Sequence, residues 1–212
     1  MEILAKNLFP TLIWTAIFDD HEKLDQQLIG LANRMREKNP AGVANTNDKG
    51  WQSPNVIQLM PEFAEFNQRI LQIARNIGES QNFRDDLEYH HEAWININPP
   101  GARNDIHIHP NCHFSGCYYA RVFPDCGSIY FRDPRMMSLM LRPPITQATQ
   151  FMATEVRMRP EAGRIFVFPA WLEHGVEPNN GNEERVSFAF NFRVAQRGEK
   201  KRPDGVVDLS EQ

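Results

Sequence analysis

The chain has 212 residues, of which 41% are apolar and 24% are charged, a composition typical of one globular domain with a sizeable core. Its 23 basic and 27 acidic residues give a net charge of −4 with no basic block, which excludes an extended nucleic-acid-binding surface. The apolar runs are too short to cross a bilayer and residues 1–10 lack the features of a secretory signal, so we expect a cytoplasmic protein without a membrane partner.

The first part of the chain, residues 1–86, is predicted to be mainly helical. An extended segment at 8–18 precedes a helix that Asp19 or Asp20 can cap. The apolar face of this helix is formed by Leu24, Leu28, Leu31 and Met35.

A long loop is predicted at residues 39–55, which are rich in Gly, Asn, Ser and Pro. A second helix begins with Pro61 in its first turn and ends near Gly78. Its apolar stripe consists of Phe63, Phe66, Ile70, Ile73 and Ile77. We expect both helices to pack on one face of a sheet.

From residue 87 onward the pattern changes to strands separated by turns rich in Pro, Gly and Asn. The predicted strands are 87–98, 106–109, 114–122, 128–131, 154–159, 164–168 and 185–194. This spacing is typical of an all-β sandwich or barrel. We therefore predict a single domain over 1–195, with a β core at 87–195 and a polar tail at 196–212.

Three cysteines, Cys112, Cys117 and Cys126, lie close together in the β region. Their odd number and the lack of a C-x-x-C pair argue against a disulfide framework and against a thiolate zinc site. We expect three reduced thiols.

A group of histidines carries the main chemical signal. His107 and His109 are one residue apart, so on a strand both imidazoles project from the same face, and His174 follows a later strand. Two ligands close in sequence and one distant ligand suit an open metal site at the mouth of a barrel, and imidazole suits iron, zinc, copper and nickel. The alternative is that His107 and His109 lie on a surface loop and that His174 is structural.

Arg185 begins the last predicted strand and shares a face with Ser187. Together they offer a guanidinium and a hydroxyl to a carboxylate. Taken alone, the sequence would favour an ion pair between Arg185 and the preceding acidic residues, Glu183 and Glu184. Its position after His174 favours a ligand-binding role.

These residues resemble the motif of the iron(II)/2-oxoglutarate-dependent oxygenases, in which His-x-Asp/Glu is followed by a distant His and then by an Arg or Lys, often as Arg-x-Ser. More narrowly, the chain is similar to prolyl-hydroxylase-like proteins of bacteria and phages. The similar stretches are 50–53, 94–98, 107–110, 115–119, 133–135 and 168–191. The resemblance covers most of the chain and rests on the combination of motifs.

The resemblance implies a mainly β fold, the double-stranded β-helix or jelly roll, with supporting N-terminal helices. It implies an oxidoreductase that hydroxylates a substrate with O2 and 2-oxoglutarate, with iron(II) held by His107, His109 and His174. Arg185 and Ser187 would then bind the far carboxylate of 2-oxoglutarate. Another divalent metal can replace iron in purified protein. The substrate, a small molecule or a peptide, cannot be read from the sequence, and a homodimer is compatible with it.

Two further groups of residues are implied as 2-oxoglutarate ligands. Related oxygenases place polar side chains on the strand before the histidine pair, where this chain has Asn96 and Asn98, although both asparagines also suit the start of the following turn. Tyr118 and Tyr119 point to opposite faces of one strand, so only one can line the pocket. We select Tyr118.

The chain departs from the family motif because His109 stands at the carboxylate position. A neutral imidazole there leaves one less negative charge on the metal and should weaken the hold on iron(II). Asp105 is the alternative carboxylate, since it lies two residues before His107 and would share its face. Asp105, His107 and His174 therefore form a second ligand set.

The runner-up family is the cupins, a relative by fold. Gly101, His107 and His109 match the start of the first cupin motif, whose glutamate is replaced here by His113. A site of three histidines, or of four with His113 included, would then make the protein a cupin-type dioxygenase or isomerase. A barrel that binds a ligand without turnover is the remaining alternative.

Overall fold

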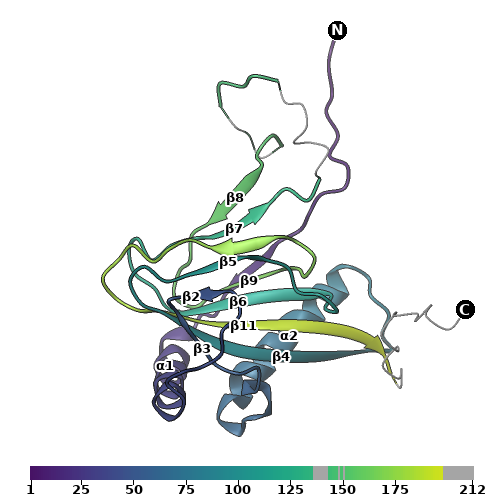
Figure 1. The fold of residues 1–212 in the computed structure, drawn as a ribbon. Helices are drawn as coiled ribbons and strands as arrows, with labels where there is room; N and C mark the ends of the chain where they lie inside the picture. Colours follow the sequence, from purple (N-terminus) through teal and green to yellow (C-terminus); the bar gives the residue numbers. More distant parts are fainter. Residues whose placement is uncertain (136–142, 148, 150, 198–212) are drawn as a thin grey trace, which may run out of the picture.

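The computed structural model describes residues 1–135, 143–147, 149 and 151–197, and these residues form two antiparallel sheets with helices on one side (Figure 1). The larger sheet consists, in spatial order, of β1 (Trp14–Ile17), β9 (Arg164–Pro169), β6 (Phe114–Arg121), β11 (Arg185–Gln196), β4 (Leu87–Asn98) and β3 (Trp51–Gln52). The smaller sheet consists of β2 (Asn47–Asp48), β5 (Arg103–His107), β10 (His174–Val176), β7 (Ile129–Arg132) and β8 (Glu155–Met158). The prediction of a mainly β fold with N-terminal helices is confirmed.

Both predicted helices are present. α1 (His21–Lys38) follows β1, and α2 (Ala64–Ser80) follows two short 3-10 turns, η1 (Ile57–Leu59) and η2 (Pro61–Phe63). Pro61 thus opens a 3-10 turn, and α2 continues two residues past Gly78. None of the helices in the described ranges is long and apolar enough to span a membrane.

The start of α1 differs from the prediction in its capping. Asp20 precedes the helix, but its side chain makes no capping hydrogen bond. The carboxylate instead accepts two hydrogen bonds from the Arg69 guanidinium of α2, at 2.5 and 2.7 Å. Asp20 therefore joins the two helices, because a bidentate guanidinium competes well against a backbone N–H for a carboxylate.

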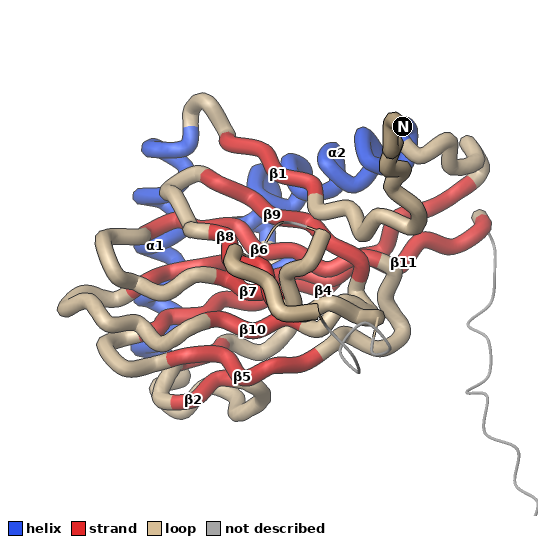
Figure 2. The backbone as a smooth tube through the Cα atoms, turned by 90° about the horizontal axis from the view of Figure 1, so that it is seen from above, coloured by secondary structure: helices blue, strands red, loops and turns tan. Residues whose placement is uncertain are grey.

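The two faces of the larger sheet are chemically different. Its outer face is apolar and lies against α1 and α2, as Figure 2 shows from above, where both helices lie behind the strands. The central side chains of this contact are Phe63, Phe66, Ile95, Ile97, Phe188, Phe190 and Phe192. On β11 these residues alternate with Arg185, Ser187 and Asn191, which face the smaller sheet. Two-residue periodicity thus gives one strand an apolar outer face and a polar inner face.

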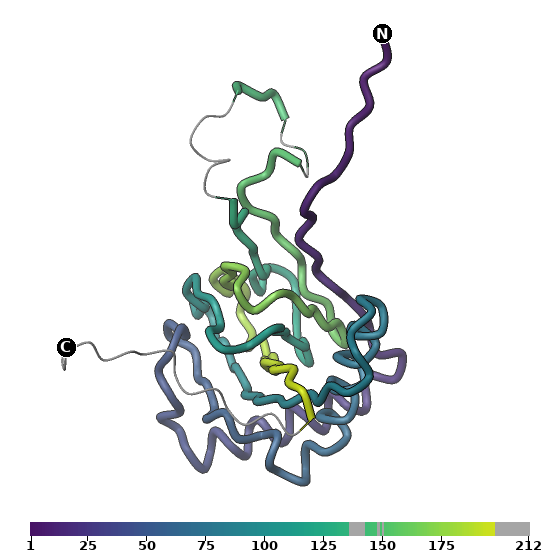
Figure 3. Tube along the Cα trace, turned by 90° about the vertical axis from the view of Figure 1, so that its right-hand side faces the viewer, coloured from purple at the N-terminus to yellow at the C-terminus, as the bar shows by residue number. Residues whose placement is uncertain are grey.

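The pairing of the long strands aligns the inner polar residues in rows. On β11, Ser187 is opposite Asn96 of β4 and Tyr119 of β6, and Arg185 is opposite Asn98. A smaller apolar cluster, formed chiefly by Tyr119, Ile129, Phe131, Phe166, Phe168 and Leu172, lies next to these polar rows, and Ile129 and Phe168 line the same cavity as Ser187 and Asn191. In Figure 3 the N-terminal segment runs upward from the larger sheet, and residues 5–11 line a pocket together with residues of β7 and β8.

The predicted strands match the structure best where they are long. β4 has the predicted bounds, and β6, β7, β8 and β9 differ from the predictions by one or two residues at their ends. β10 was not predicted, and the loop predicted at 39–55 contains β2 and β3. The predicted tail, apart from Gln196 and Arg197, lies outside the described residues.

Candidate metal centre

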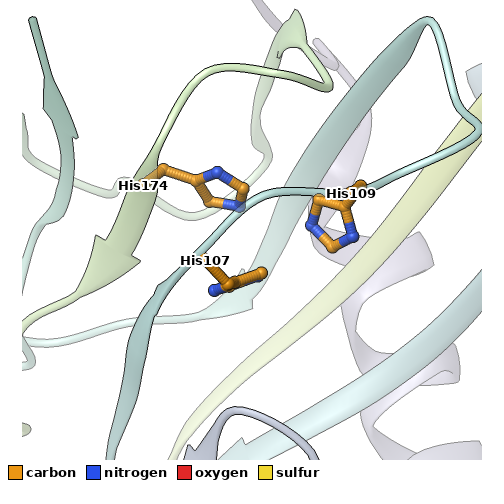
Figure 4. Close-up of side chains that lie close together, drawn as sticks. All are labelled: His107, His109 and His174. Carbon is orange, nitrogen blue, oxygen red and sulfur yellow. The ribbon is translucent and has the colours of Figure 1, made fainter. Parts of the chain in front are cut away.

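Three imidazoles meet at one end of the space between the sheets. His107 is the last residue of β5, His174 is the first residue of β10, and the two are direct partners in the antiparallel pairing. His109 lies two residues past β5. One ring nitrogen from each of the three lies within 4.8 Å of the others, and Figure 4 shows the rings gathered around a common space. They line a cavity of about 340 Å³ between the sheets.

Backbone carbonyls set the tautomers of two of these rings. His107 Nδ1 lies 2.7 Å from the carbonyl oxygen of Asp105, and His174 Nδ1 lies 2.8 Å from the carbonyl oxygen of Leu172. A carbonyl oxygen only accepts, so each Nδ1 carries the proton and donates it. Both Nε2 atoms are thereby left with a free lone pair, as a metal ligand requires.

The site favours neutral imidazoles. Burial lowers the pKa of His107, and burial together with the neighbouring His107 lowers the pKa of His109 to about 4 and that of His174 to about 3. All three rings are therefore neutral at neutral pH and need not release a proton before binding a metal.

Aromatic rings and an amide surround the histidines. Trp94 of β4 lies 5.7 Å from the ring of His109, and Phe168 lies 4.5 Å from the ring of His174. The amide nitrogen of Asn191 lies 3.4 Å from His109 Nδ1. The amide nitrogen is a donor, so this long contact meets a lone pair on His109 Nδ1. Unlike the carbonyl contacts of His107 and His174, it does not set an Nε2 lone pair for a metal.

The alternative ligand Asp105 lies outside this group. Its carboxylate is exposed and accepts a 2.9 Å hydrogen bond from Arg103. The expectation that Asp105 shares a face with His107 is wrong, because the register between β5 and β10 shifts: His174 is opposite His107, whereas Val176 is opposite Asn104. β5 thus has one residue more than its partner, and this bulge breaks the alternation so that Asn104 and His107 both face the cavity.

His113 is also absent from the group. Its ring is exposed, and its Nδ1 accepts a hydrogen bond from the backbone N–H of Val194 at 3.0 Å. The expected four-histidine site is therefore not formed. The turn after His109 directs the chain into β6 before His113 can return to the cavity.

Arg185 lies deeper between the sheets and is 1% exposed. Its Nη1 donates to the backbone carbonyls of Cys126 and Gly127, and its Nε has no hydrogen-bond partner. Ser187, on the same face of β11, lines the cavity. The structure thus places these two residues on the inner face, as the sequence predicted.

Of the two adjacent tyrosines, the structure places Tyr119 rather than Tyr118 on the inner face, so the selection of Tyr118 is wrong. Tyr118 faces α1, where its hydroxyl donates to Asp25 at 2.6 Å. Tyr119 is 1% exposed, its hydroxyl has no hydrogen-bond partner, and burial raises its pKa. The alternation alone could not tell which face of β6 is the inner one. Pairing with Ser187 of β11 decides this.

Unpartnered polar atoms suggest what the inner wall would bind. Arg185 Nε, the Tyr119 hydroxyl and the Oδ1 atoms of Asn96 and Asn98 are all buried without a partner. Asn96 lines the cavity, whereas Asn98 donates to Asn104 at 3.4 Å. Such atoms are costly unless a ligand or water satisfies them. A guanidinium with an adjacent phenol and hydroxyl fits a carboxylate ligand, and three neutral imidazoles with open positions fit a divalent transition metal.

Comparisons with known proteins agree with this site. The family model described as "Putative 2OG-Fe(II) oxygenase" matches residues 92–191, which include the three histidines, Arg185 and Ser187. No curated protein matches the chain in sequence.

Three similar solved structures identify the fold. A prolyl-4-hydroxylase from Pseudomonas putida is 16% identical with a TM-score of 0.63, over 86% of this chain and 93% of that one. SnoN, a non-heme alpha ketoglutarate dependent epimerase from nogalamycin biosynthesis, is 14% identical with a TM-score of 0.64, over 95% and 84% of the two chains. HygX from Streptomyces hygroscopicus, with nickel and 2-oxoglutarate bound, is 12% identical with a TM-score of 0.61, over 86% and 82%. The predicted double-stranded β-helix fold is confirmed.

Proposed function

We propose that the chain is an iron(II)/2-oxoglutarate-dependent oxygenase, as the family model over residues 92–191 supports, and that it hydroxylates a small-molecule or peptide substrate. In this reaction one atom of O2 enters the substrate and the other enters succinate as 2-oxoglutarate loses CO2. The observation that carries the proposal is the convergence of three neutral imidazoles on one cavity, together with a buried guanidinium nitrogen of Arg185 that has no partner on the same face of β11 as the cavity-lining Ser187. We propose a cytoplasmic location for this activity.

His107, His109 and His174 would hold the metal. When bound, iron(II) supplies the centre at which O2 and 2-oxoglutarate react. The protein's contribution is to present three imidazoles, with the Nε2 lone pairs of His107 and His174 set by backbone carbonyls. Three imidazoles bring no negative charge, so this site should hold iron(II) less tightly than one with a carboxylate ligand.

Arg185, Ser187 and Tyr119 would hold the far carboxylate of 2-oxoglutarate. A carboxylate is costly to bury unless a cation and hydrogen-bond donors meet it. Arg185 Nε and the Tyr119 hydroxyl are buried donors without partners, and Ser187 adds a hydroxyl on the same row. Asn96 and Asn98, on the neighbouring strand, complete the polar inner wall.

The test is an anaerobic titration with iron(II) and 2-oxoglutarate, followed by the metal-to-ligand charge-transfer absorption. We expect the band to appear at one iron per chain and to be lost in His174→Ala. Asp105→Ala is the matched control and should retain the band, since this carboxylate is exposed and paired with Arg103. A parent protein that binds neither iron nor 2-oxoglutarate would refute the proposed function.

A further inference from the structure

The cavity beside His109 contains a single acidic side chain, Glu92. Among the described residues that line this cavity, Glu92 is the only carboxylate, and neither lysine nor arginine is among them. The amide and hydroxyl side chains that line the cavity are Asn45, Thr46, Gln52, Asn55, Asn96, Asn104, Ser115, Ser187 and Asn191. Such a lining disfavours an anionic substrate group. It favours a cationic group, which can pair with the Glu92 carboxylate.

Two amides hold the Glu92 carboxylate in place. Oε1 accepts a hydrogen bond from Asn191 at 2.8 Å, and Oε2 accepts one from Asn55 at 3.3 Å. Within the described ranges Glu92 forms no ion pair, and Arg193, two residues beyond Asn191 on β11, does not line the cavity. Amide donors orient a carboxylate but leave its charge uncompensated. A half-buried carboxylate of this kind is therefore a strong site for a cation.

An indole ring stands next to this carboxylate. Trp94 follows Glu92 by two residues on β4, so both side chains lie on the same face, and both line the cavity. A carboxylate and an indole on the same wall of a cavity together favour an ammonium or guanidinium group, through ion pairing and the cation–π interaction. Asn191, which contacts both Glu92 and His109, places this environment one amide away from the metal ligand.

We propose that the substrate carries an ammonium or guanidinium group, and that Glu92 pairs with this group while Trp94 covers it. The proposal rests on the proposed function, because it uses the same cavity. The substrate group that lies near the reacting carbon would thus be positively charged. A competing role for Glu92 is to position His109 through Asn191, and metal affinity separates the two roles.

The experiment measures binding of matched probes to the full chain loaded with nickel(II), with and without 2-oxoglutarate, by NMR titration. The probes are Nα-acetyl methylamides of arginine and lysine as cations, norleucine as the neutral form and glutamate as the anion. We expect a cationic probe to bind about tenfold or more tighter than the norleucine probe, and the glutamate probe to bind most weakly. In Glu92→Gln this preference should disappear while nickel affinity stays unchanged.

The matched control is Glu88→Gln, which changes another glutamate of β4 that pairs with Arg197 and does not line the cavity. It should retain the preference for cations. Equal binding of the cationic and neutral probes, absence of binding by every probe, or loss of nickel from Glu92→Gln would each overturn the proposal. If 2-oxoglutarate fails to bind while the cation preference persists on nickel alone, the proposed function fails and the charge assignment stands.

Discussion

At the scale of single residues, Arg185 gives the sharpest test of how 2-oxoglutarate would be bound. Arg185→Ala would leave the far carboxylate buried without a cation, and we expect 2-oxoglutarate affinity to fall roughly a hundredfold, or ~3 kcal/mol. Arg185→Lys restores the charge without the planar fork and should give an intermediate loss. Calorimetry on the nickel-loaded protein measures both.

The control for this series is Arg157→Ala, which removes an exposed arginine of β8. It should bind 2-oxoglutarate as the parent does. Thermal unfolding of each variant shows whether the fold is retained. Unchanged affinity in a folded Arg185→Ala protein would contradict the assignment of this residue.

At the scale of elements, Glu184 joins three parts of the chain. It lies just before β11, its carboxylate accepts hydrogen bonds from Arg36 of α1 at 2.6 and 3.1 Å, and Arg121 of β6 approaches within 3.4 Å. The hydrogen bond from Arg36 holds the pKa of Glu184 below its usual value of 4.5. This carboxyl group therefore stabilises α1 against the sheet when it is ionised.

The pH dependence follows from that direction. Because the folded state lowers the pKa of Glu184, its contribution is fully present above the unfolded value and is lost as the pH falls through the folded value. Urea unfolding at ~pH 6 and ~pH 3 should show a larger loss of stability in the parent than in Glu184→Gln. Identical losses in the two proteins would show that this contact contributes nothing to acid sensitivity.

The bulge in β5 decides which side chains of this strand face the metal centre. By adding one residue between Asn104 and His107, it turns the Asp105 carboxylate to solvent and brings the His107 ring opposite His174. The ligand set thus depends on a local irregularity in β5, one of the strands that line the cavity. A regular strand would have presented Asp105 and His107 together.

At the scale of the whole molecule, metal binding should stabilise the fold, because the ligands come from β5, from the segment just after it and from β10, which are brought together only by folding. A ligand at a hundredfold excess over its Kd adds about 2.7 kcal/mol, which corresponds to a rise in Tm of several degrees for a chain of this size. Scanning calorimetry with nickel(II) and after chelation measures the shift. An equal shift in His174→Ala would place the stabilising ion elsewhere.

The residues alone predicted the features that depend on local periodicity. The alternation along 87–98 was long enough to give the bounds of β4, and the stripes of α1 and α2 predicted which side chains cover the sheet. The spacing of His107 and His109 and the strand before His174 indicated that three imidazoles could meet, and the resemblance to the oxygenase motif favoured this over a surface loop with a structural histidine. Each of these patterns is set by backbone geometry within a few residues.

Features that depend on partner strands were decided only by the tertiary structure. The bulge that excludes Asp105 exists only in the pairing of β5 with β10, and the inner face of β6, hence Tyr119 rather than Tyr118, is chosen by its pairing with β11. β10 is three residues long and is defined by the strands on either side of it. Glu92 gave no signal in the sequence beyond sharing a strand face with Asn96. Its uncompensated charge appears only once β4, β11 and the loop at Asn55 enclose it, because burial and charge pairing are properties of neighbours distant along the chain.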